Sequence, residues 1–334
     1  MRITRGTPVT IVLVGIAVGL LGLQGANAVR DRERPPAARN DAGLALGVTT
    51  LSLARNGTNP WHPSDLNREV NAFERAAERR TSVVSWFADL SGTGFQASQA
   101  RAVAQRGAIP EITLEPWNAA RIGRRQPEWS LRTIVAGKHD AALTAWANGA
   151  AAYGKPIRLR FAHEMNGTSY PCAIGGNGNT AAQFVAAWIH VHKLFGRAGA
   201  TNVAWVWAPV TGKVNAELYP GDAWVDRLGL SGFNGGTKLF KRGWRTFDAA
   251  FAEPLDELHA LAPTLPVELS EVASAEEGGS KPQWIHELFA GLRARPWIDT
   301  VVWFHLRKET DWRINSSEAS RAAFAAEAAK LDQP

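Results

Sequence analysis

The sequence contains few residues of several types, and each shortage excludes a kind of structure or chemistry. Its 334 residues include one cysteine, Cys172, and only two methionines and three tyrosines. One cysteine cannot form an intramolecular disulfide, so the fold must be held by its core, and the chain is long enough to bury a large one. A catalytic thiol is conceivable, but nothing in the sequence argues for one.

Long hydrophobic runs are also missing, except at the N-terminus. Arg2 and Arg5 precede the apolar stretch Val9–Leu23, and Ala26–Ala28 has the small-x-small form of a cleavage site. This pattern predicts a secretory signal peptide over residues 1–28, and hence a secreted protein without stable membrane association. The alternative is a membrane anchor through residues 8–23, a stretch that is short for a bilayer span.

The excess of basic charge is small once the N-terminal region is set aside. Removal of residues 1–28 lowers the net charge from +6 to +4, and residues 29–40 carry +2 of what is left. The remainder is too small to indicate a nucleic-acid partner. Pro35-Pro36 and the high charge density make residues 29–40 a predicted flexible linker. We expect the rest of the chain to be a monomer.

Tryptophan, in contrast, is abundant, with 14 residues. Some of these side chains must belong to the core. Flat indole rings at a cleft also stack well on the apolar faces of sugars, which is a weak indication of carbohydrate binding.

Short β-like runs alternate with longer amphipathic segments along residues 41–334. The predicted strands are Leu44–Val48, Ser82–Phe87, Ile109–Leu114, Ile157–Ala162, Val203–Trp207, Leu228–Gly232, Val267–Ser270 and Thr300–Phe304. The predicted helices are Leu66–Arg79, Ala97–Arg106, Asp140–Tyr153, Thr180–Ala198, Ala249–Leu261, Pro282–Arg293 and Ser317–Leu331. Eight such units predict one α/β domain, a (β/α)8 TIM barrel. A doubly wound sheet would need a glycine-rich phosphate turn after the first strand, and GVTTLSLARNG is not one.

Polar residues that end strands are the candidate site, because catalytic groups of such barrels lie at the carboxyl ends of the strands. The fourth strand ends in His163-Glu164, and the seventh, PVELSE, ends in Glu271. A zinc protease would need a second histidine where Gly167 stands, and a serine hydrolase would need a Gly-x-Ser-x-Gly turn that is missing at the strand–helix junctions. No cluster has the spacing of metal ligands, so no metal or organic cofactor is expected.

Two glutamates on opposite walls of a barrel mouth suit glycoside hydrolysis, in which one carboxyl group protonates the leaving oxygen and the other serves the anomeric carbon. Strand alternation would point Arg160 to the same side as Glu164, where it could hold ionised carboxylates. The same alternation would turn Glu268 toward the helices, which makes it a weaker nucleophile candidate than Glu271.

Several segments resemble glycoside hydrolase family 26, the β-mannanase family, as a divergent member. They are RLRFAHEMNG, NGNTAAQFVAAWIHVHKLFGRAGATNVAWVWAP, PVELSEVASAEEGGSKPQWI and VVWFHLRKETDWRINSS. The resemblance implies retaining hydrolysis of a polysaccharide, with Glu164 as acid/base, Glu271 as nucleophile, His163 at the cleaved sugar and Trp303 as a stacking platform. The residues expected to contact substrate are Arg160, His163, Asn166, Trp117, Tyr170, Phe233, Asn234 and Trp303.

The resemblance is incomplete in ways that bear on function. Relatives commonly have a tyrosine where Phe233 stands, and aromatic residues usual after the fourth strand are replaced by Ser169 and Cys172. β-1,4-Mannan is the first expected substrate, followed by mixed-linkage β-glucan, β-xylan or a bacterial surface polysaccharide. A carbohydrate-binding barrel that no longer cleaves, or a different hydrolase on the same barrel, are the alternatives.

Overall fold

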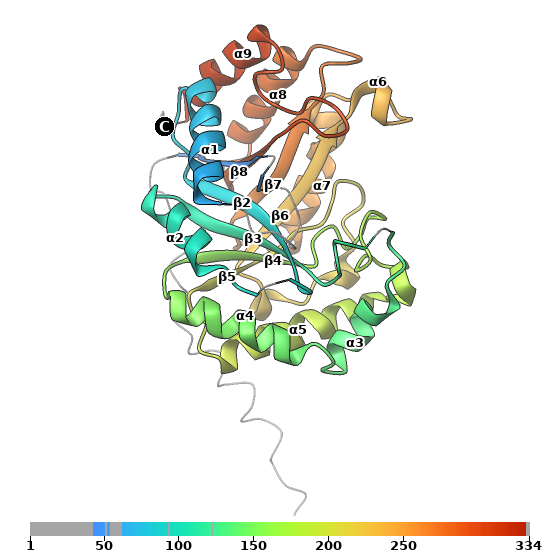
Figure 1. Ribbon diagram of the computed structural model, residues 1–334. Helices are drawn as coiled ribbons and strands as arrows, with labels where there is room; N and C mark the ends of the chain where they lie inside the picture. The colour runs from blue at the N-terminus through green and yellow to red at the C-terminus, as the bar shows by residue number, and fades with distance from the viewer. Residues whose placement is uncertain (1–42, 51, 54–61, 93, 122, 332–334) are drawn as a thin grey trace, which may run out of the picture. The chain divides into compact units, whose positions relative to one another are not determined.

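The computed structural model describes residues 43–50, 52–53, 62–92, 94–121 and 123–331. The predicted signal peptide and linker lie outside the described residues. The described chain forms a closed barrel of parallel strands in the order β1-β2-β3-β4-β5-β6-β7-β8, with helices around it (Figure 1). The predicted (β/α)8 fold is therefore confirmed.

Each strand pairs with the next along the chain, and β8 closes the barrel against β1 from Ala45↔Thr300 to Thr50↔His305. The strands are β1 Ala45–Thr50, β2 Val83–Asp89, β3 Ile109–Glu115, β4 Ile157–Phe161, β5 Val203–Trp207, β6 Arg227–Asn234, β7 Val267–Ser274 and β8 Ile298–His305. The helices are α1 Pro63–Ala77, α2 Ala97–Gln105, α3 Leu131–Val135, α4 Asp140–Tyr153, α5 Ala181–Arg197, α6 Gly236–Leu239, α7 Phe247–Leu261, α8 Lys281–Arg293 and α9 Glu318–Ala328.

Helix boundaries follow local chemistry. The Thr180 side chain accepts from the backbone N–H of Gln183 while the Gln183 side chain accepts from the backbone N–H of Thr180, a capping box that begins α5. Gly154 ends α4 with a left-handed backbone that costs glycine little. Between β5 and β6 the fully described chain has only two short 3-10 turns, Ala216–Leu218 and Asp222–Trp224, in place of an α-helix.

The molecule has two interiors of different chemistry. The layer between strands and helices is apolar; its large, fully buried side chains include Trp188, Trp207, Trp284 and Trp303. Inside the barrel, charged groups reach across from opposite walls: Arg158 of β4 contacts Glu268 of β7, with 2.9 Å between Nη1 and Oε2. Side chains of β4 and β7 can meet in this way only through the centre of the barrel.

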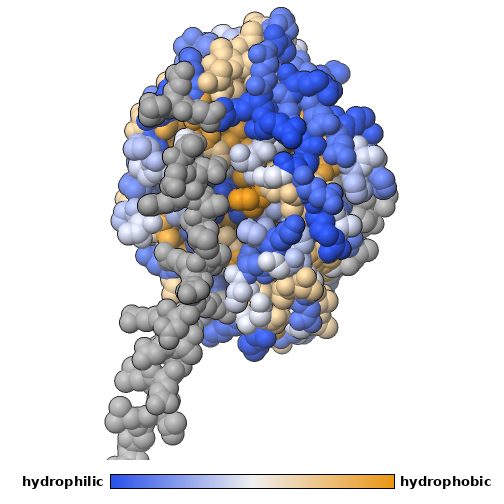
Figure 2. Space-filling model, turned by 90° about the vertical axis from the view of Figure 1, so that its left-hand side faces the viewer, coloured by the Kyte–Doolittle hydropathy of each residue, from blue (hydrophilic) through white to orange (hydrophobic). Residues whose placement is uncertain are grey.

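The outer surface is that of an ordinary globular protein. Figure 2 shows the face that lies to the left in Figure 1, where hydrophilic residues are concentrated at the upper right and along the right-hand side. Side chains of α1 and α9 form ion pairs on the surface, such as Arg68–Asp65 and Arg321–Glu318. Within the part of the chain that the structure describes, no helix has the length and apolar character needed to cross a membrane.

Candidate functional site

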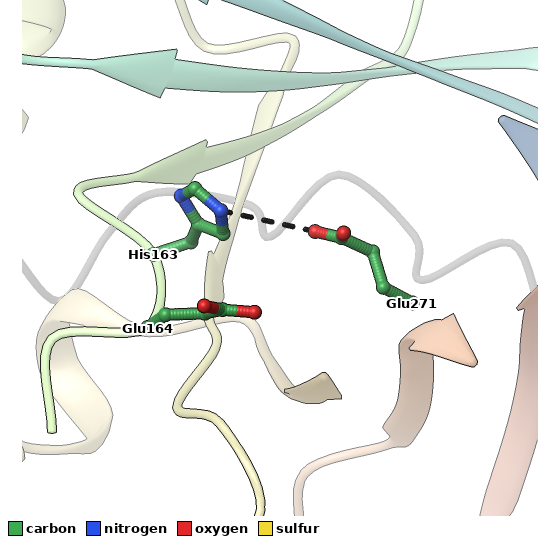
Figure 3. Close-up of side chains that lie close together, drawn as sticks. All are labelled: His163, Glu164 and Glu271. Carbon is green, nitrogen blue, oxygen red and sulfur yellow. Dashed lines mark ion pairs between the residues drawn. The ribbon is translucent and has the colours of Figure 1, made fainter. Parts of the chain in front are cut away.

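The end of β4 directs two neighbouring side chains toward one point. In a regular strand His163 and Glu164 would face opposite sides. Ala162 and Glu164, however, have φ angles of 49° and 52°, in the left-handed region that residues other than glycine rarely adopt. The alternation is broken there, and both side chains point toward Glu271 (Figure 3).

Glu271 reaches the same point because β7 contains one extra residue. Leu230 pairs with Leu269, whereas Ser231 pairs with Glu271, so Ser270 has no counterpart on β6. Glu271 is 3% exposed, and its carboxyl group accepts a hydrogen bond of 2.7 Å from Nη2 of Arg160, which also donates to Ser231. Arg160 is thus placed beneath the nucleophile candidate, where it orients the carboxylate but lies too deep to touch a substrate.

The same extra residue corrects the expectation for Glu268. Simple alternation turns Glu268 toward the helices, but its carboxylate lies inside the barrel and accepts hydrogen bonds from Arg158, Arg227 and Ser270. Glu268 is therefore the counter-ion of two arginines and faces away from the barrel mouth. We call Glu111, Arg158, Arg227 and Glu268 the floor cluster.

Glu111 of β3 completes the floor cluster. Its Oε2 lies 3.9 Å from Arg158 and its Oε1 lies 4.0 Å from Arg160. Complete burial and the neighbouring Glu268 carboxylate hold the pKa of Glu111 well above its usual range. Glu111 is consequently the protonated member of a carboxylic acid–carboxylate pair with Glu268. With Glu111 neutral, the charges of the interior balance. The three arginines, Arg158, Arg160 and Arg227, face three negative charges, from Glu268, Asp299 and Glu271.

At the mouth, burial drives the ionisable groups toward their neutral forms. Burial and the Glu271 carboxylate raise the pKa of Glu164 to about 8, although Arg160 opposes the shift. Burial, followed by Arg160, holds the pKa of His163 well below its usual range. At neutral pH, then, Glu164 carries a proton and His163 is an uncharged imidazole. We call Glu115, His163, Glu164 and Glu271 the mouth cluster.

The distances within the mouth cluster bear on its chemistry. His163, Glu164 and Glu271 each present one ligand-type atom, and these atoms lie within 4.8 Å of one another. Nε2 of His163 is 3.8 Å from Oε1 of Glu271. A carboxyl separation of about 5–5.5 Å is typical of retaining glycosidases, whereas inverting enzymes leave about 6.5–9.5 Å for a water molecule. The two carboxyl groups are therefore closer together than the inverting arrangement requires, which favours the retaining one.

The same three groups also have the donor types of a metal site. One imidazole nitrogen and two carboxylate oxygens are ligands that zinc accepts. Residues 163, 164 and 271 come together only in three dimensions, so their spacing along the chain gives no sign of the cluster. An ion held there would occupy both carboxyl groups and leave neither available for acid–base work.

Glu115 is a member of the site that the sequence places at a strand end without assigning it a role. It is 1% exposed, and burial raises its pKa to about 8. It pairs in register with Asp89 at the end of β2, whose Oδ2 accepts from the backbone N–H of Ala119. Its position at the end of β3, before Pro116 and Trp117, is the signal that could have identified it.

Aromatic rings surround the mouth cluster. The half-buried Tyr170 ring lies 4.3 Å from the His163 ring and 6.0 Å from the Trp117 ring, measured between centroids. On the other side, Phe233 packs edge-on against Phe304 at 5.2 Å. Of the residues expected to contact substrate, Trp117, Tyr170 and Phe233 are thus partly exposed around the site.

Trp312, on the loop after β8, was missed by sequence reasoning and joins these rings. Its centroid is 5.3 Å from that of Phe233, and its backbone carbonyl accepts from the indole of Trp303. The loop is held from below by Lys281, which is fully buried and donates to the carbonyls of Asp311 and Arg313.

Four of the expected substrate contacts need correction: Arg160, which lies too deep to reach a substrate, and three residues whose side chains are engaged elsewhere. Trp303 is fully buried and packs against Trp284 of α8 and Phe324 of α9, because it faces the helices, so its ring cannot stack on a sugar. The side-chain amide of Asn166 holds the loop after β5, since it donates to the carbonyl of Val210 and accepts from the backbone N–H of the same residue. Asn234 is 1% exposed; it donates to Ser274 and accepts from the backbone N–H of Arg245.

Cys172 behaves as the sequence suggests. It is a buried free cysteine, and burial raises the pKa of its thiol. A thiol that resists ionisation is a poor nucleophile, so Cys172 is not an activated cysteine.

Comparisons with known proteins give a consistent relationship. Residues 135–246, which contain Glu164 but not Glu271, match the family model for Glycosyl hydrolase family 26. Endoglucanase H of Acetivibrio thermocellus is 35% identical over 327 residues, which cover 95% of this chain and 32% of that protein. The chain therefore spans about a third of the length of this relative.

Solved structures share the fold. A family 26 β-mannanase from Bacteroides ovatus superimposes with a TM-score of 0.65 at 16% identity, covering 87% of this chain and 90% of that one. The catalytic domain of an endo-β-1,4-mannanase from Bacillus sp. JAMB-750 gives a TM-score of 0.62 at 18% identity, covering 85% of each chain. At these identities the similarity establishes the barrel alone.

Proposed function

The chain belongs to glycoside hydrolase family 26, and on that premise we propose that it is a secreted, retaining endo-β-glycosidase that cleaves a β-linked polysaccharide. The observation that supports this most directly is the placement of Glu164 and Glu271, whose oxygens lie within 4.8 Å of each other. The two groups differ in environment, since Glu164 is held protonated while Glu271 accepts a charge-assisted hydrogen bond from Arg160.

In the first step, the Glu271 carboxylate attacks the anomeric carbon while Glu164 donates its proton to the glycosidic oxygen. The bond to the leaving sugar breaks and a glycosyl–Glu271 ester forms. A pKa of about 8 keeps Glu164 loaded for this donation at neutral pH. Arg160 holds Oε1 of Glu271, which leaves the other carboxylate oxygen for the attack.

In the second step, Glu164 is a carboxylate and takes a proton from water, which attacks the anomeric carbon and releases Glu271. His163 stays neutral next to both carboxyl groups, so it neither competes with Arg160 for Glu271 nor removes the proton of Glu164. Its ring is fixed between Phe87 at 5.6 Å and Tyr170 at 4.3 Å.

The sugar is proposed on separate grounds. The relative that is 35% identical is named an endoglucanase, which favours a β-glucan. The sequence-based expectation of β-1,4-mannan is the second candidate, supported by the mannanase character of the family motifs. The half-buried rings of Trp117 and Tyr170 would offer surfaces to either sugar, because stacking depends on the apolar face of the pyranose ring.

The test uses the full chain on mixed-linkage β-glucan, β-1,4-mannan, glucomannan and xylan, with new reducing ends as the readout. Glu164→Gln and Glu271→Gln are expected to lose about 10³-fold or more of the activity, since each removes a group that acts in the transition state. Glu277→Gln is the matched control, because Glu277 is an exposed carboxylate on the loop after β7.

Two results would overturn the proposal. One is full activity of the Glu271→Gln variant on the cleaved polymer. The other is binding of a polymer by the unaltered chain without release of new ends, which would support the alternative of a binding barrel that does not cleave. Proton NMR of the first product should show the β-anomer, as retention requires.

A further inference from the structure

The loop from β6 to α7, residues 235–246, is strongly basic. It contains four cations and no aspartate or glutamate; they are Lys238, Lys241, Arg242 and Arg245. Lys238, Lys241 and Arg242 are exposed, and none of the four has a carboxylate partner within the described part of the chain. Phe240, in the middle of the loop, is 43% exposed, which is unusual for a large apolar side chain in this protein.

This basic loop is held in place rather than left free. The backbone N–H of Arg245 is bound by Asn234, and the indole of Trp284 donates to the carbonyl of Arg245. Gly278 approaches Thr237 so closely that an added Cβ would lie 2.9 Å from its backbone nitrogen. The four positive charges are therefore presented by a loop that is packed against the neighbouring loop after β7.

A second basic segment stands on another part of the same rim. The loop after β3 has three exposed arginines, Arg121, Arg124 and Arg125, of which Arg121 pairs with Glu128. Asn177 anchors this segment: its amide nitrogen donates to the carbonyl of Arg124 and its oxygen accepts from the backbone N–H of Gln126. Both basic segments follow carboxyl ends of strands, so they lie at the same end of the barrel as Glu164 and Glu271.

The centre of the site has the opposite character. Asp89, Glu115, Glu164 and Glu271 bring four buried carboxyl groups together at the strand ends, against the single buried guanidinium of Arg160 that contacts Glu271. A negatively charged substrate group would find no free cation at this centre, because Arg160 is already paired with Glu271. The buried Glu271 carboxylate would also repel it, since burial strengthens electrostatic interactions. The same group would be attracted at the rim.

We propose that the substrate is a polyanionic β-glycan, with oxyanion substituents such as carboxylates on some of its sugars, and that the chain cuts it next to a sugar that carries no charge. This inference rests on the proposed glycosidase function and names the substrate class. Lysine and arginine of the two loops bind the charged substituents on sugars that flank the cut, because arginine presents paired donors to planar oxyanions. The carboxyl-rich centre accepts only an uncharged sugar.

The experiment compares one polymer in two states of charge. Mixed-linkage β-glucan and the same glucan with a fraction of its 6-hydroxymethyl groups oxidised to carboxylates are assayed with the full chain at about 20 mM and about 500 mM NaCl. We expect kcat/KM to be about fivefold or more higher on the oxidised glucan at low salt, chiefly through KM, and the preference to disappear at high salt. The new reducing ends should be glucose and not glucuronate.

A charge-matched pair of variants assigns the preference to the loop. Combining Lys238→Ser, Lys241→Ser and Arg242→Ser should abolish it without loss of activity on neutral glucan, since these side chains are exposed and outside the mouth cluster. Combining Arg75→Ser, Arg101→Ser and Lys155→Ser removes the same charge from exposed positions of α1, α2 and the turn after α4, and should leave the preference intact.

Each outcome separates the two proposals. Equal activity on both glucans, an unchanged preference in the loop variant, or glucuronate at the new reducing ends would overturn the polyanion inference while leaving the glycosidase intact. Salt-sensitive retardation of the full chain by oxidised but not neutral glucan in affinity gels, without cleavage of either, would support binding of the polyanion by the two loops and overturn the proposed hydrolysis.

Discussion

The floor and the mouth of the barrel contain the same residue types but organise them in opposite ways. In the floor cluster, every guanidinium has a carboxylate: Glu268 serves Arg158 and Arg227, at 2.9 Å and 3.0 Å. In the mouth cluster, carboxyl groups outnumber cations, and the imidazole nitrogens of His163 lack hydrogen-bond partners in the described chain. The charges of the floor are balanced, whereas the imidazole of the mouth is left without partners.

The difference separates the charged residues that stabilise the barrel from those that are available to a ligand. Unpaired buried polar groups are costly, and proteins retain them mainly where a ligand will supply the missing partners. A sugar, with its hydroxyl groups, is such a ligand for the mouth. Arg160 connects the regions, since it bonds Glu271 above and lies 4.0 Å from Glu111 below.

The largest expected effect is on stability and comes from removing the shared counter-ion of the floor cluster. Glu268→Ala leaves two buried arginines without their shared counter-ion, and we expect a loss of about 3–5 kcal/mol in the free energy of unfolding. Urea denaturation measures it. The control Glu128→Ala removes the exposed partner of Arg121 and should change stability by about 0–1 kcal/mol. Similar losses in the two variants would contradict the distinction between a structural floor and an ordinary surface pair.

The next prediction concerns the proton on Glu164. Because its pKa is about 8, the donor form is lost as pH rises through that value, and kcat/KM should fall about tenfold per pH unit above it. Glu115 has a similar pKa, so Glu115→Gln is the necessary comparison. The alkaline limb should persist in Glu115→Gln; if it vanishes there, the limb belongs to Glu115 and the acid assignment is wrong.

A smaller effect is expected in the pH dependence of stability. Glu115 and Glu164 have folded pKa values near 8 against a usual value near 4.5, so between these limits the folded state binds protons that the unfolded state has released. Stability should therefore decrease as pH rises toward 8, most clearly from about pH 7.5, where unfolded histidines have lost most of their protons. Melting temperatures across this range, compared with those of a Glu115→Gln/Glu164→Gln variant, test it; an equal slope in both would contradict it.

The smallest effect should come from Glu111→Gln. Because Glu111 is the protonated partner of Glu268, an amide of the same shape can donate the same hydrogen bond, and we expect a change below about 1 kcal/mol. Activity should also be preserved, since Arg160 keeps its place below Glu271. A loss comparable to that of Glu268→Ala would show that Glu111 is ionised and that the floor is not balanced as described.

Most of the barrel could be predicted from the sequence because the period of the apolar residues distinguishes its strands from its helices. The strand Val203–Trp207 and the helix Asp140–Tyr153 are found as expected. Strands β6 and β7 extend two and four residues further than predicted, to Asn234 and Ser274, because the polar residues Asn234, Glu271 and Ser274 interrupt the apolar pattern of a strand.

The site was predicted less completely, for two physical reasons. Counting alternate residues fails wherever the strand is irregular, as the extra residue at Ser270 shows for Glu268 and the left-handed Ala162 shows for His163. Residue type also fails to reveal which face a tryptophan occupies. Trp303 faces the helices, while Trp312, nine residues later in a loop, lies against Phe233. Signal-peptide cleavage and secretion stay predictions.

The left-handed residues at the end of β4 have a consequence for protein engineering. Ala162 and Glu164 hold a backbone that costs about 1–2 kcal/mol each relative to ordinary conformations. Searches for thermostable variants favour substitutions that relieve such costs, and a relaxed, regular β4 would turn His163 or Glu164 away from Glu271. Thermostabilising libraries should therefore hold residues 162–164 constant and seek their gains on the outer helices, where stability and catalysis are not in competition.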